Sequence, residues 1–251
     1  MDFYNQIADS YDEMTNLDSH MDGIRSFIER IKTRYELRSA IDVACGTGRH
    51  AVVMSQMGIR AVGADISAAM LEKARAFTRQ ARVQTQWINC PMQELSQHVN
   101  ENFDIVLCLG NSLPHILSQE DIDKTISGFA KVLRPGGVLF IQLLNYRKIL
   151  EQKDRIVAIT RKGNNEYIRF YDFLPKLIQF NLLKIDWQGK QSKHTLASTP
   201  LFPYTADILQ ETLQKHQFST INTYSDLNFN SFDEDKSPGL VIEAYNQTTA
   251  E

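Results

Sequence analysis

The feature that most constrains the fold is a regular alternation of short apolar strands and amphipathic helices between residues 40 and 144. Strand-like segments include AIDVACG at 40–46, IRAVGADI at 59–66 and FDIVLCLG at 103–110, and a helical pattern follows each of them. FDIVLCLG is almost wholly apolar, as expected of a strand that is covered on both faces. Strands that alternate with helices favour a parallel sheet with helices on both sides. The sequence therefore predicts an α/β fold with a doubly wound sheet.

The pattern changes after Tyr146. Several consecutive segments now read as strands, and in KLIQFNLLKIDW apolar and polar residues alternate. A helix beginning near Thr205 and two final strands then return to the first pattern. We expect a small inserted antiparallel β subdomain. The expected division is an N-terminal helical cap at 1–35, a core at 36–152 and 200–251, and an inserted lid at 153–199.

Charge and cysteine content limit the function. The 251 residues carry a formal net charge of -3, which makes a nucleic-acid partner unexpected. The three cysteines are far apart and form no C-x-x-C pair, so we predict neither a disulfide framework nor a metal site. Reduced thiols and the absence of a signal-like N-terminus point to a cytoplasmic protein. No apolar run approaches the roughly 18 residues of a membrane span, so no membrane contact is expected.

A glycine loop follows the first strand. Gly46, Gly48 and Ala51 fit G-x-G-x-x-A, a spacing that lets backbone approach a ligand at a helix N-terminus. Asp65 ends the next strand, where a carboxylate can accept hydrogen bonds from ribose hydroxyls. Asp42 puts a second carboxylate beside the loop, which disfavours a pyrophosphate and favours a cation such as an amino-acid ammonium. Its alternative role is to cap backbone amides. S-adenosylmethionine satisfies both demands, and a dinucleotide-linked oxidoreductase is the competing interpretation.

Four segments in order carry a family resemblance. DVACGTGRHA, GADIS, FDIVLCLGNSLPHIL and VLRPGGVLFIQ resemble the successive motifs of the class I S-adenosylmethionine-dependent methyltransferases. CLGNSLPHI and LLNYRKIL are most similar to the glycine N-methyltransferase group. The resemblance implies a Rossmann-like doubly wound sheet, mostly parallel with an antiparallel last strand. It also implies N- or O-methylation of a small-molecule acceptor, with S-adenosylhomocysteine as product.

The resemblance further implies a set of cofactor contacts. These are Tyr4, Tyr11, Arg25, Ala44, Gly46, Gly48, Asp65, Ile66, Met70, Met92 and Leu109. Asp65 would hold the ribose, Met92 would meet the adenine edge through its backbone, and the two tyrosines would close over the cofactor.

Catalysis and acceptor binding are expected at a second set of residues. Asn111 and His115 would lie beside the reacting methyl group, with His115 as a base or an orienting group. Its alternative role is simple packing. Tyr146, Tyr167 and Tyr171 are expected to contact the acceptor, although aromatic residues of the insertion equally suit the core of a small sheet. In-line methyl transfer needs mainly alignment and exclusion of water, so the motifs do not reveal the acceptor.

Two departures from the family pattern matter. Pro91 stands where an aspartate often precedes Met92, so adenine recognition must use backbone groups or water. Leu144 stands where the glycine-methylating enzymes have an arginine before Asn145 and Tyr146, so we do not predict glycine as acceptor. The remaining alternatives are an inactive cofactor-binding protein and an RNA or protein methyltransferase. We expect a monomer or homodimer.

Overall fold

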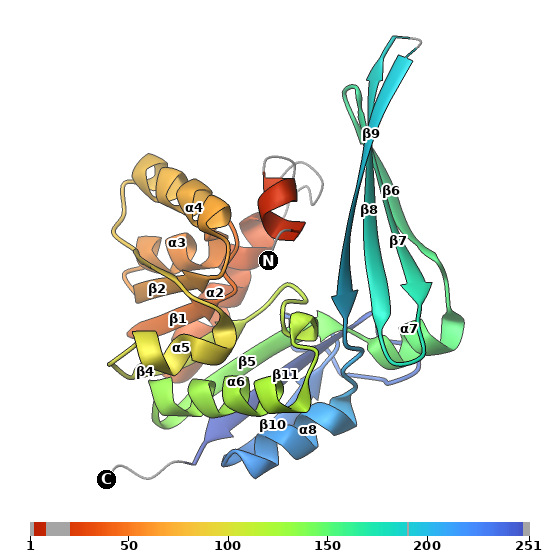
Figure 1. The fold of residues 1–251 in the computed structure, drawn as a ribbon. Coiled ribbons are helices and arrows are strands. Elements are labelled where there is room, and N and C mark those ends of the chain that lie inside the picture. The colour runs from red at the N-terminus through yellow and green to blue at the C-terminus, as the bar shows by residue number, and fades with distance from the viewer. Residues whose placement is uncertain (1–2, 9–20, 190, 248–251) are drawn as a thin grey trace.

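A seven-stranded sheet forms the centre of the molecule (Figure 1). The computed structural model describes residues 3–8, 21–189 and 191–247. In the order β10-β11-β5-β4-β1-β2-β3, the strands are β10 (Phe218–Tyr224), β11 (Gly239–Asn246), β5 (Leu133–Leu144), β4 (Phe103–Cys108), β1 (Ser39–Val43), β2 (Arg60–Asp65) and β3 (Gln86–Asn89). Strands β1 to β5 pair in parallel, whereas β11 is antiparallel to both neighbours. The predicted mostly parallel sheet with an antiparallel last strand is confirmed.

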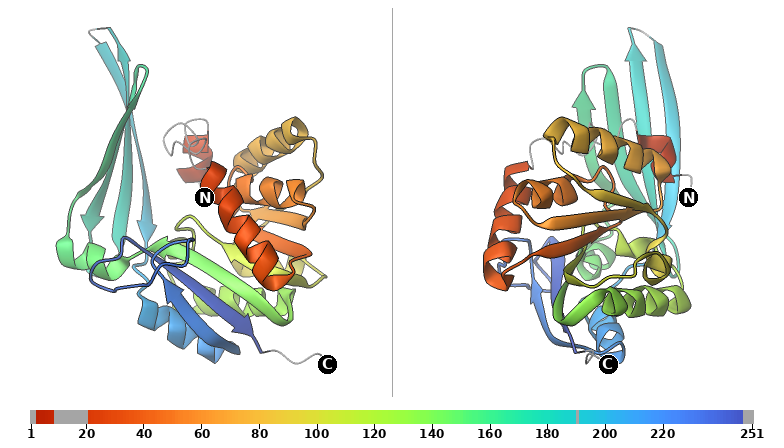
Figure 2. Two further views of the ribbon diagram at one scale, coloured as in Figure 1. Left: turned by 180° about the vertical axis from the view of Figure 1, so that it is seen from behind. Right: turned by 90° about the vertical axis from the view of Figure 1, so that its left-hand side faces the viewer.

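Helices cover both faces of this sheet (Figure 2). One layer consists of α2 (Met21–Tyr35), α3 (Arg49–Gln56) and α4 (Ala68–Ala81), and the other of α5 (Leu95–His98), α6 (Gln119–Val132) and α8 (Ala206–Lys215). Two hydrophobic clusters lie between the helices and the sheet, one on each face. None of the helices in these described parts of the chain is long and apolar enough to cross a membrane.

Side-chain caps mark the starts of two helices. Ser67 Oγ accepts a hydrogen bond from the Met70 N–H at 3.2 Å at the start of α4, and Ser118 Oγ accepts one from the Asp121 N–H at 3.1 Å at the start of α6. Thr205 precedes α8 as expected, but its side chain makes no capping hydrogen bond.

A separate four-stranded antiparallel sheet interrupts the main fold. It contains β6 (Ile156–Lys162), β7 (Asn165–Phe173), β8 (Ile178–Gln188) and β9 (Gln191–Leu201), paired in that order. The short helix α7 (Tyr146–Gln152) leads into it, and the sheet projects well beyond the main body (Figures 1 and 2). The predicted inserted antiparallel sheet is confirmed. A helical turn at residues 3–8 packs against this sheet, because Phe3 and Ile7 share a cluster with Tyr167.

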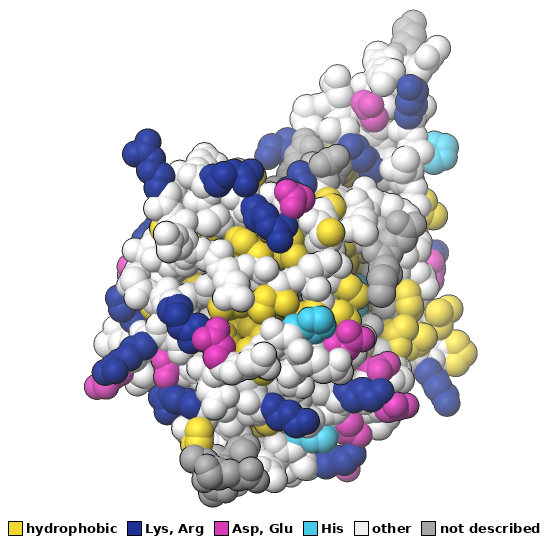
Figure 3. Space-filling view, turned by 60° about the vertical axis from the view of Figure 1, so that its left-hand side comes forward, with side chains coloured by type: hydrophobic (Ala, Val, Ile, Leu, Met, Phe, Trp, Pro, Cys, Tyr) yellow, Lys and Arg dark blue, Asp and Glu magenta, His cyan; other side chains and the backbone are white. Residues whose placement is uncertain are grey.

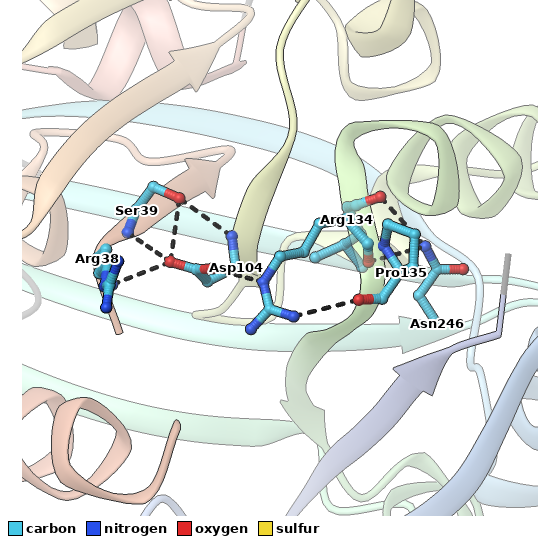
Figure 4. A network of polar contacts seen from close by, with 7 residues as sticks. Arg38, Ser39, Asp104, Arg134, Pro135 and Asn246 are labelled. Carbon is cyan, nitrogen blue, oxygen red and sulfur yellow. Dashed lines mark hydrogen bonds and ion pairs between the residues drawn. The ribbon is translucent and has the colours of Figure 1, made fainter. Parts of the chain in front are cut away.

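A polar network ties the amino ends of the parallel strands together (Figure 4). Asp104 accepts hydrogen bonds from the backbone N–H groups of Arg38 and Ser39 at 2.9 and 2.8 Å, and from Arg134 Nε at 2.6 Å. Nearby, Asn246 Nδ2 donates to three carbonyls at the junction of α6 and β5. This end of the sheet is therefore occupied by structural contacts.

Figure 3 shows the surface of another face of the molecule. Hydrophobic side chains gather near the centre of this face, and charged side chains surround them.

Candidate functional site

Two neighbouring cavities lie at the carboxyl ends of the parallel strands, the place where open α/β sheets bind ligands. The smaller cavity has a volume of about 310 Å³ and the larger about 610 Å³. They share three wall residues, Phe3, Tyr4 and His115. A molecule in one cavity therefore adjoins a molecule in the other at these three side chains.

The smaller cavity is built from the ends of successive strands. Ala44 and Gly46 follow β1, Asp65 and Ile66 lie at the end of β2, and the segment 90–93 follows β3. The remaining wall residues are Met70, Ser112, Leu117, Thr199 and Pro200. Gly46 has a φ of +54°, and a Cβ built there would meet nothing within 4 Å. The backbone of the loop is thus open to a ligand.

Asp65 is the central polar group of the smaller cavity. One carboxylate oxygen accepts the Gly46 N–H at 2.8 Å and the other accepts the Ser67 N–H at 2.8 Å. Burial raises the pKa of Asp65, and these two hydrogen bonds act in the opposite direction. Each oxygen of a carboxylate can accept more than one hydrogen bond. Asp65 therefore holds the glycine loop and still has capacity to accept hydroxyl groups from a ligand.

Asp42 does not lie at the mouth of the loop, so that interpretation is wrong. Its side chain is only 2% exposed, and Ala51, in the first turn of α3, hydrogen-bonds to it through its backbone. Strand alternation places Asp42 on the same face as Ala40, which packs in the cluster beneath α2 and α3. Burial raises the pKa of Asp42 to about 8, and the charge of Asp65 adds to the effect. The alternative role, capping of backbone amides, is the correct one.

His115 stands at the junction of the two cavities. Its Nε2 lies 2.8 Å from Tyr4 Oη, and its Nδ1 lies 3.4 Å from Thr199 Oγ1. Burial lowers the pKa of His115 to about 4. The imidazole is therefore neutral near pH 7 and can act as a hydrogen-bonding and orienting group.

Asn111 connects β4 to the wall of the larger cavity. It has a φ of +67°, and its Oδ1 accepts the Leu144 N–H at 3.0 Å. Its Nδ2 donates to Tyr146 Oη at 2.9 Å. Both Asn111 and Leu144 line the larger cavity, and Tyr146 supports them from behind with no exposed surface.

The structure brings together most of the predicted site residues. Those that line a cavity are Tyr4, Ala44, Gly46, Asp65, Ile66, Met70, Met92, Asn111, His115 and Tyr171. Tyr11 lies outside the described residues.

Two predicted cofactor contacts have other surroundings. Gly48 lines neither cavity, and a Cβ at this position would lie 2.3 Å from Cη2 of Trp87. Its glycine is needed for close packing and for a φ of +77°. Arg25 is exposed on α2, and its Nη2 donates to Gln56 Oε1 at 3.2 Å, so it points to α3.

Three further predicted residues support the site from within the core. Leu109 is 4% exposed and packs in the cluster below α2 and α3. Tyr146 and Tyr167 are fully buried and line neither cavity. Tyr167 packs against Phe3 and Ile7, which is the core alternative that its aromatic character allowed.

Arg169 is a cavity residue that the sequence interpretation missed. It lies on β7 and lines the larger cavity together with Tyr171. Since side chains alternate along a strand, the spacing of Tyr167, Arg169 and Tyr171 in EYIRFYDF would have placed all three on one face.

Comparisons with known proteins agree with this geometry. The sequence family described as "Methyltransferase domain" matches residues 40–137. The glycine/sarcosine N-methyltransferase of Halorhodospira halochloris is 26% identical over 245 residues, covering 96% of this chain and 87% of that protein. That of Aphanothece halophytica is 27% identical over 224 residues, covering 87% of this chain and 80% of that protein. The matched domain and these relatives support a class I S-adenosylmethionine-dependent methyltransferase.

Solved structures show that this methyltransferase has the expected fold over nearly its whole length. An S-adenosylmethionine-dependent methyltransferase from Clostridium acetobutylicum superposes with a TM-score of 0.84 at 18% identity, covering 98% of this chain and 99% of the other. The sugar N-methyltransferase KedS8 from Streptoalloteichus superposes with a TM-score of 0.67 at 16% identity, covering 91% and 87%. The inserted sheet therefore belongs to a known arrangement of the fold.

The smaller cavity fits the cofactor of this methyltransferase. Its volume falls within the range of about 300–1,000 Å³ that is typical of small-molecule sites. Asp65 supplies acceptors, Gly46 leaves the backbone open, and Ile66, Met70 and Met92 supply apolar walls suited to a flat base. Cys90 and Pro91, which precede Met92, also line it.

Proposed function

We propose that this methyltransferase transfers the methyl group of S-adenosylmethionine to a nitrogen or oxygen of a small molecule held in the larger cavity. The observation that supports this proposal most directly is that the two cavities adjoin and share the wall residues Phe3, Tyr4 and His115. A donor and an acceptor that occupy the two cavities are brought together at one junction. Holding two reactants in this way supplies most of what an in-line displacement requires.

The cofactor roles follow from the walls of the smaller cavity. Asp65 accepts the ribose hydroxyls, while Ala44 and Gly46 pass close to the amino-acid end. Ile66 and Met70 flank the adenine, and the segment around Met92 meets its edge through backbone groups. These assignments rest on the position of each residue in the cavity wall and on the orientation of Asp65 by Gly46 and Ser67.

His115 is proposed to position the reactants rather than to carry a proton. When bound, the cofactor supplies an activated methyl group and a neutral leaving group, so no acid is needed. An imidazole with a pKa of about 4 is also a weak base. Paired with Tyr4 and Thr199, it lines the junction between the cavities and helps to exclude water. Asn111 orients the wall on the acceptor side.

A small acceptor is favoured over RNA or protein. The larger cavity is walled by the main sheet, the inserted sheet and residues of the helical turn at 3–8. The relatives named above are glycine/sarcosine and sugar N-methyltransferases, which favours nitrogen as the methylated atom. We also propose a cytoplasmic location and a monomeric or homodimeric state. The division of the chain into cap, core and inserted lid is likewise a proposal.

Calorimetric titration and a transfer assay test this function. We expect the wild-type protein to bind S-adenosylhomocysteine and to transfer labelled methyl groups to members of a panel of small amines and hydroxy compounds. Failure to bind the product would refute the proposal. Binding without transfer to any small molecule, in a metabolite extract as well as in the panel, would favour the inactive binding protein. Label appearing only in RNA or protein would favour a macromolecular acceptor.

A further inference from the structure

The larger cavity contains an arginine whose charge the described chain does not neutralise. Arg169 lines this cavity from β7. Its Nε is buried without a hydrogen-bond partner, and no ion pair among the described residues includes its guanidinium. A buried N–H donor that has lost its water without gaining an acceptor is costly. A ligand that brings an acceptor would remove this cost.

The strand register directs Arg169 toward the cavity. Arg169 and Tyr171 are alternate residues of β7, and they lie opposite Leu182 and Phe180 of β8. Tyr171 and Phe180 line the same cavity, and their ring centroids are 6.0 Å apart. The charge of Arg169 also acts on the Tyr171 hydroxyl, since burial raises the pKa of Tyr171 to about 12 and Arg169 opposes that rise. Arg169 is thus a cation set in an aromatic wall.

The acidic residue of the cavity wall, Asp226, does not meet this demand. Its carboxylate accepts the Asn228 N–H at 2.8 Å and Asn230 Nδ2 at 2.8 Å, both from its own loop. It forms no ion pair with Arg169 among the described contacts. Asp226 is therefore supplied with donors, whereas Arg169 lacks an acceptor.

A single negative charge suits the cavity better than two. Among the described residues that line the cavity, Arg169 is the one arginine or lysine and Asp226 is an acid. A monoanion can pair with Arg169, whereas the second negative charge of a dianion would have no such cation to pair with and would share a partly apolar site with Asp226. The planar guanidinium matches the two oxygens of a carboxylate. Phe180, Leu144 and Leu201 supply apolar walls for the rest of the ligand.

We propose that Arg169 binds the carboxylate of the methyl acceptor, and that the acceptor is a monocarboxylic acid with an apolar body. This inference rests on the proposed function, because it takes the larger cavity as the acceptor site. The cavity of about 610 Å³ has room for a molecule well above the size of glycine. Arg169 then selects the acceptor by charge, and the apolar walls select its body.

The test measures binding of a non-reactive acid and its neutral counterpart to protein saturated with S-adenosylhomocysteine. Calorimetry compares 3-phenylpropionate with 3-phenylpropionamide. We expect the wild type to bind the acid about tenfold or more tightly than the amide, the usual gain from a charge-assisted pair. Arg169→Gln removes this preference and Arg169→Lys retains part of it. Arg161→Gln, which removes an exposed arginine of β6, leaves the preference unchanged.

Each other outcome counts against a specific claim. Equal binding of acid and amide by the wild type, or a preference that survives in Arg169→Gln, overturns the assignment of Arg169. If the dianionic 2-phenylethylphosphonate binds more tightly than 3-phenylpropionate, the proposal that the acceptor is a monocarboxylic acid is overturned. Binding of S-adenosylhomocysteine is measured first in each sample: its absence defeats the proposed function, whereas its presence without acid preference defeats the Arg169 inference alone.

Discussion

Replacing Asp65 by asparagine tests whether its carboxylate binds the cofactor in addition to holding the glycine loop. The two oxygens of Asp65 accept the Gly46 and Ser67 N–H groups, each at 2.8 Å, and their remaining lone pairs are available in the smaller cavity. Asparagine replaces one oxygen by a donor and removes the charge. Losing one hydrogen bond to a charged group costs about 1.5–3 kcal/mol. The Kd for S-adenosylhomocysteine is therefore expected to rise about 10- to 100-fold.

Asp104→Asn is the matched control. Asp104 also accepts two backbone N–H groups, from Arg38 and Ser39, but at the amino ends of the strands (Figure 4). We expect this variant to unfold at a lower temperature and to keep the wild-type Kd. Calorimetric titration and thermal unfolding of both variants provide the comparison. If Asp65→Asn lowers the unfolding temperature but leaves the Kd unchanged, the carboxylate only holds the glycine loop and the reasoning fails.

Three further outcomes are expected. Because burial holds the pKa of His115 at about 4, the pH profile of kcat/KM should show no histidine inflection near the ordinary value of about 6.5, and an inflection that disappears in His115→Gln would contradict this. Gly48→Ala should lower the free energy of unfolding by about 3 kcal/mol in urea denaturation, through its positive φ and the clash with Trp87, and wild-type stability would refute the packing role. Asp104 should stabilise the protein above the ordinary carboxyl pKa and lose this contribution in acid, because its hydrogen bonds from Arg134, Arg38 and Ser39 outweigh burial and lower its pKa. The stability difference between wild type and Asp104→Asn should therefore shrink as the pH falls, and a constant difference would contradict it.

The cofactor side of the site was largely predictable. The strand ends that carry Gly46, Asp65 and Met92 follow from hydrophobic patterns a few residues long, and parallel pairing brings such ends to one edge of the sheet. Asp42 was the exception. Its carboxylate could face either the ligand or helix α3. The outcome depended on which face of strand β1 is covered by α3, and the local sequence pattern does not contain that information.

The acceptor side was less predictable, because distant segments build it. Phe3 comes from the N-terminal helical turn, Arg169 from the inserted sheet and Asn111 from the end of β4. Aromatic residues in β7 suit a core and a pocket equally well. The packing of residues 3–8 decided that Tyr167 belongs to the core and Tyr171 to the cavity wall.

The sequence by itself determined the doubly wound sheet, the glycine loop and the carboxylate at the end of β2, because each depends on local periodicity and spacing. Only the tertiary structure decided that Asp42 caps α3, that Gly48 makes room for Trp87 and that Arg169 faces the larger cavity. These depend on which elements pack together. The larger cavity thus has no arginine at position 144 but has one at position 169, on another strand. The order of residues along the chain did not reveal that both positions line the same cavity.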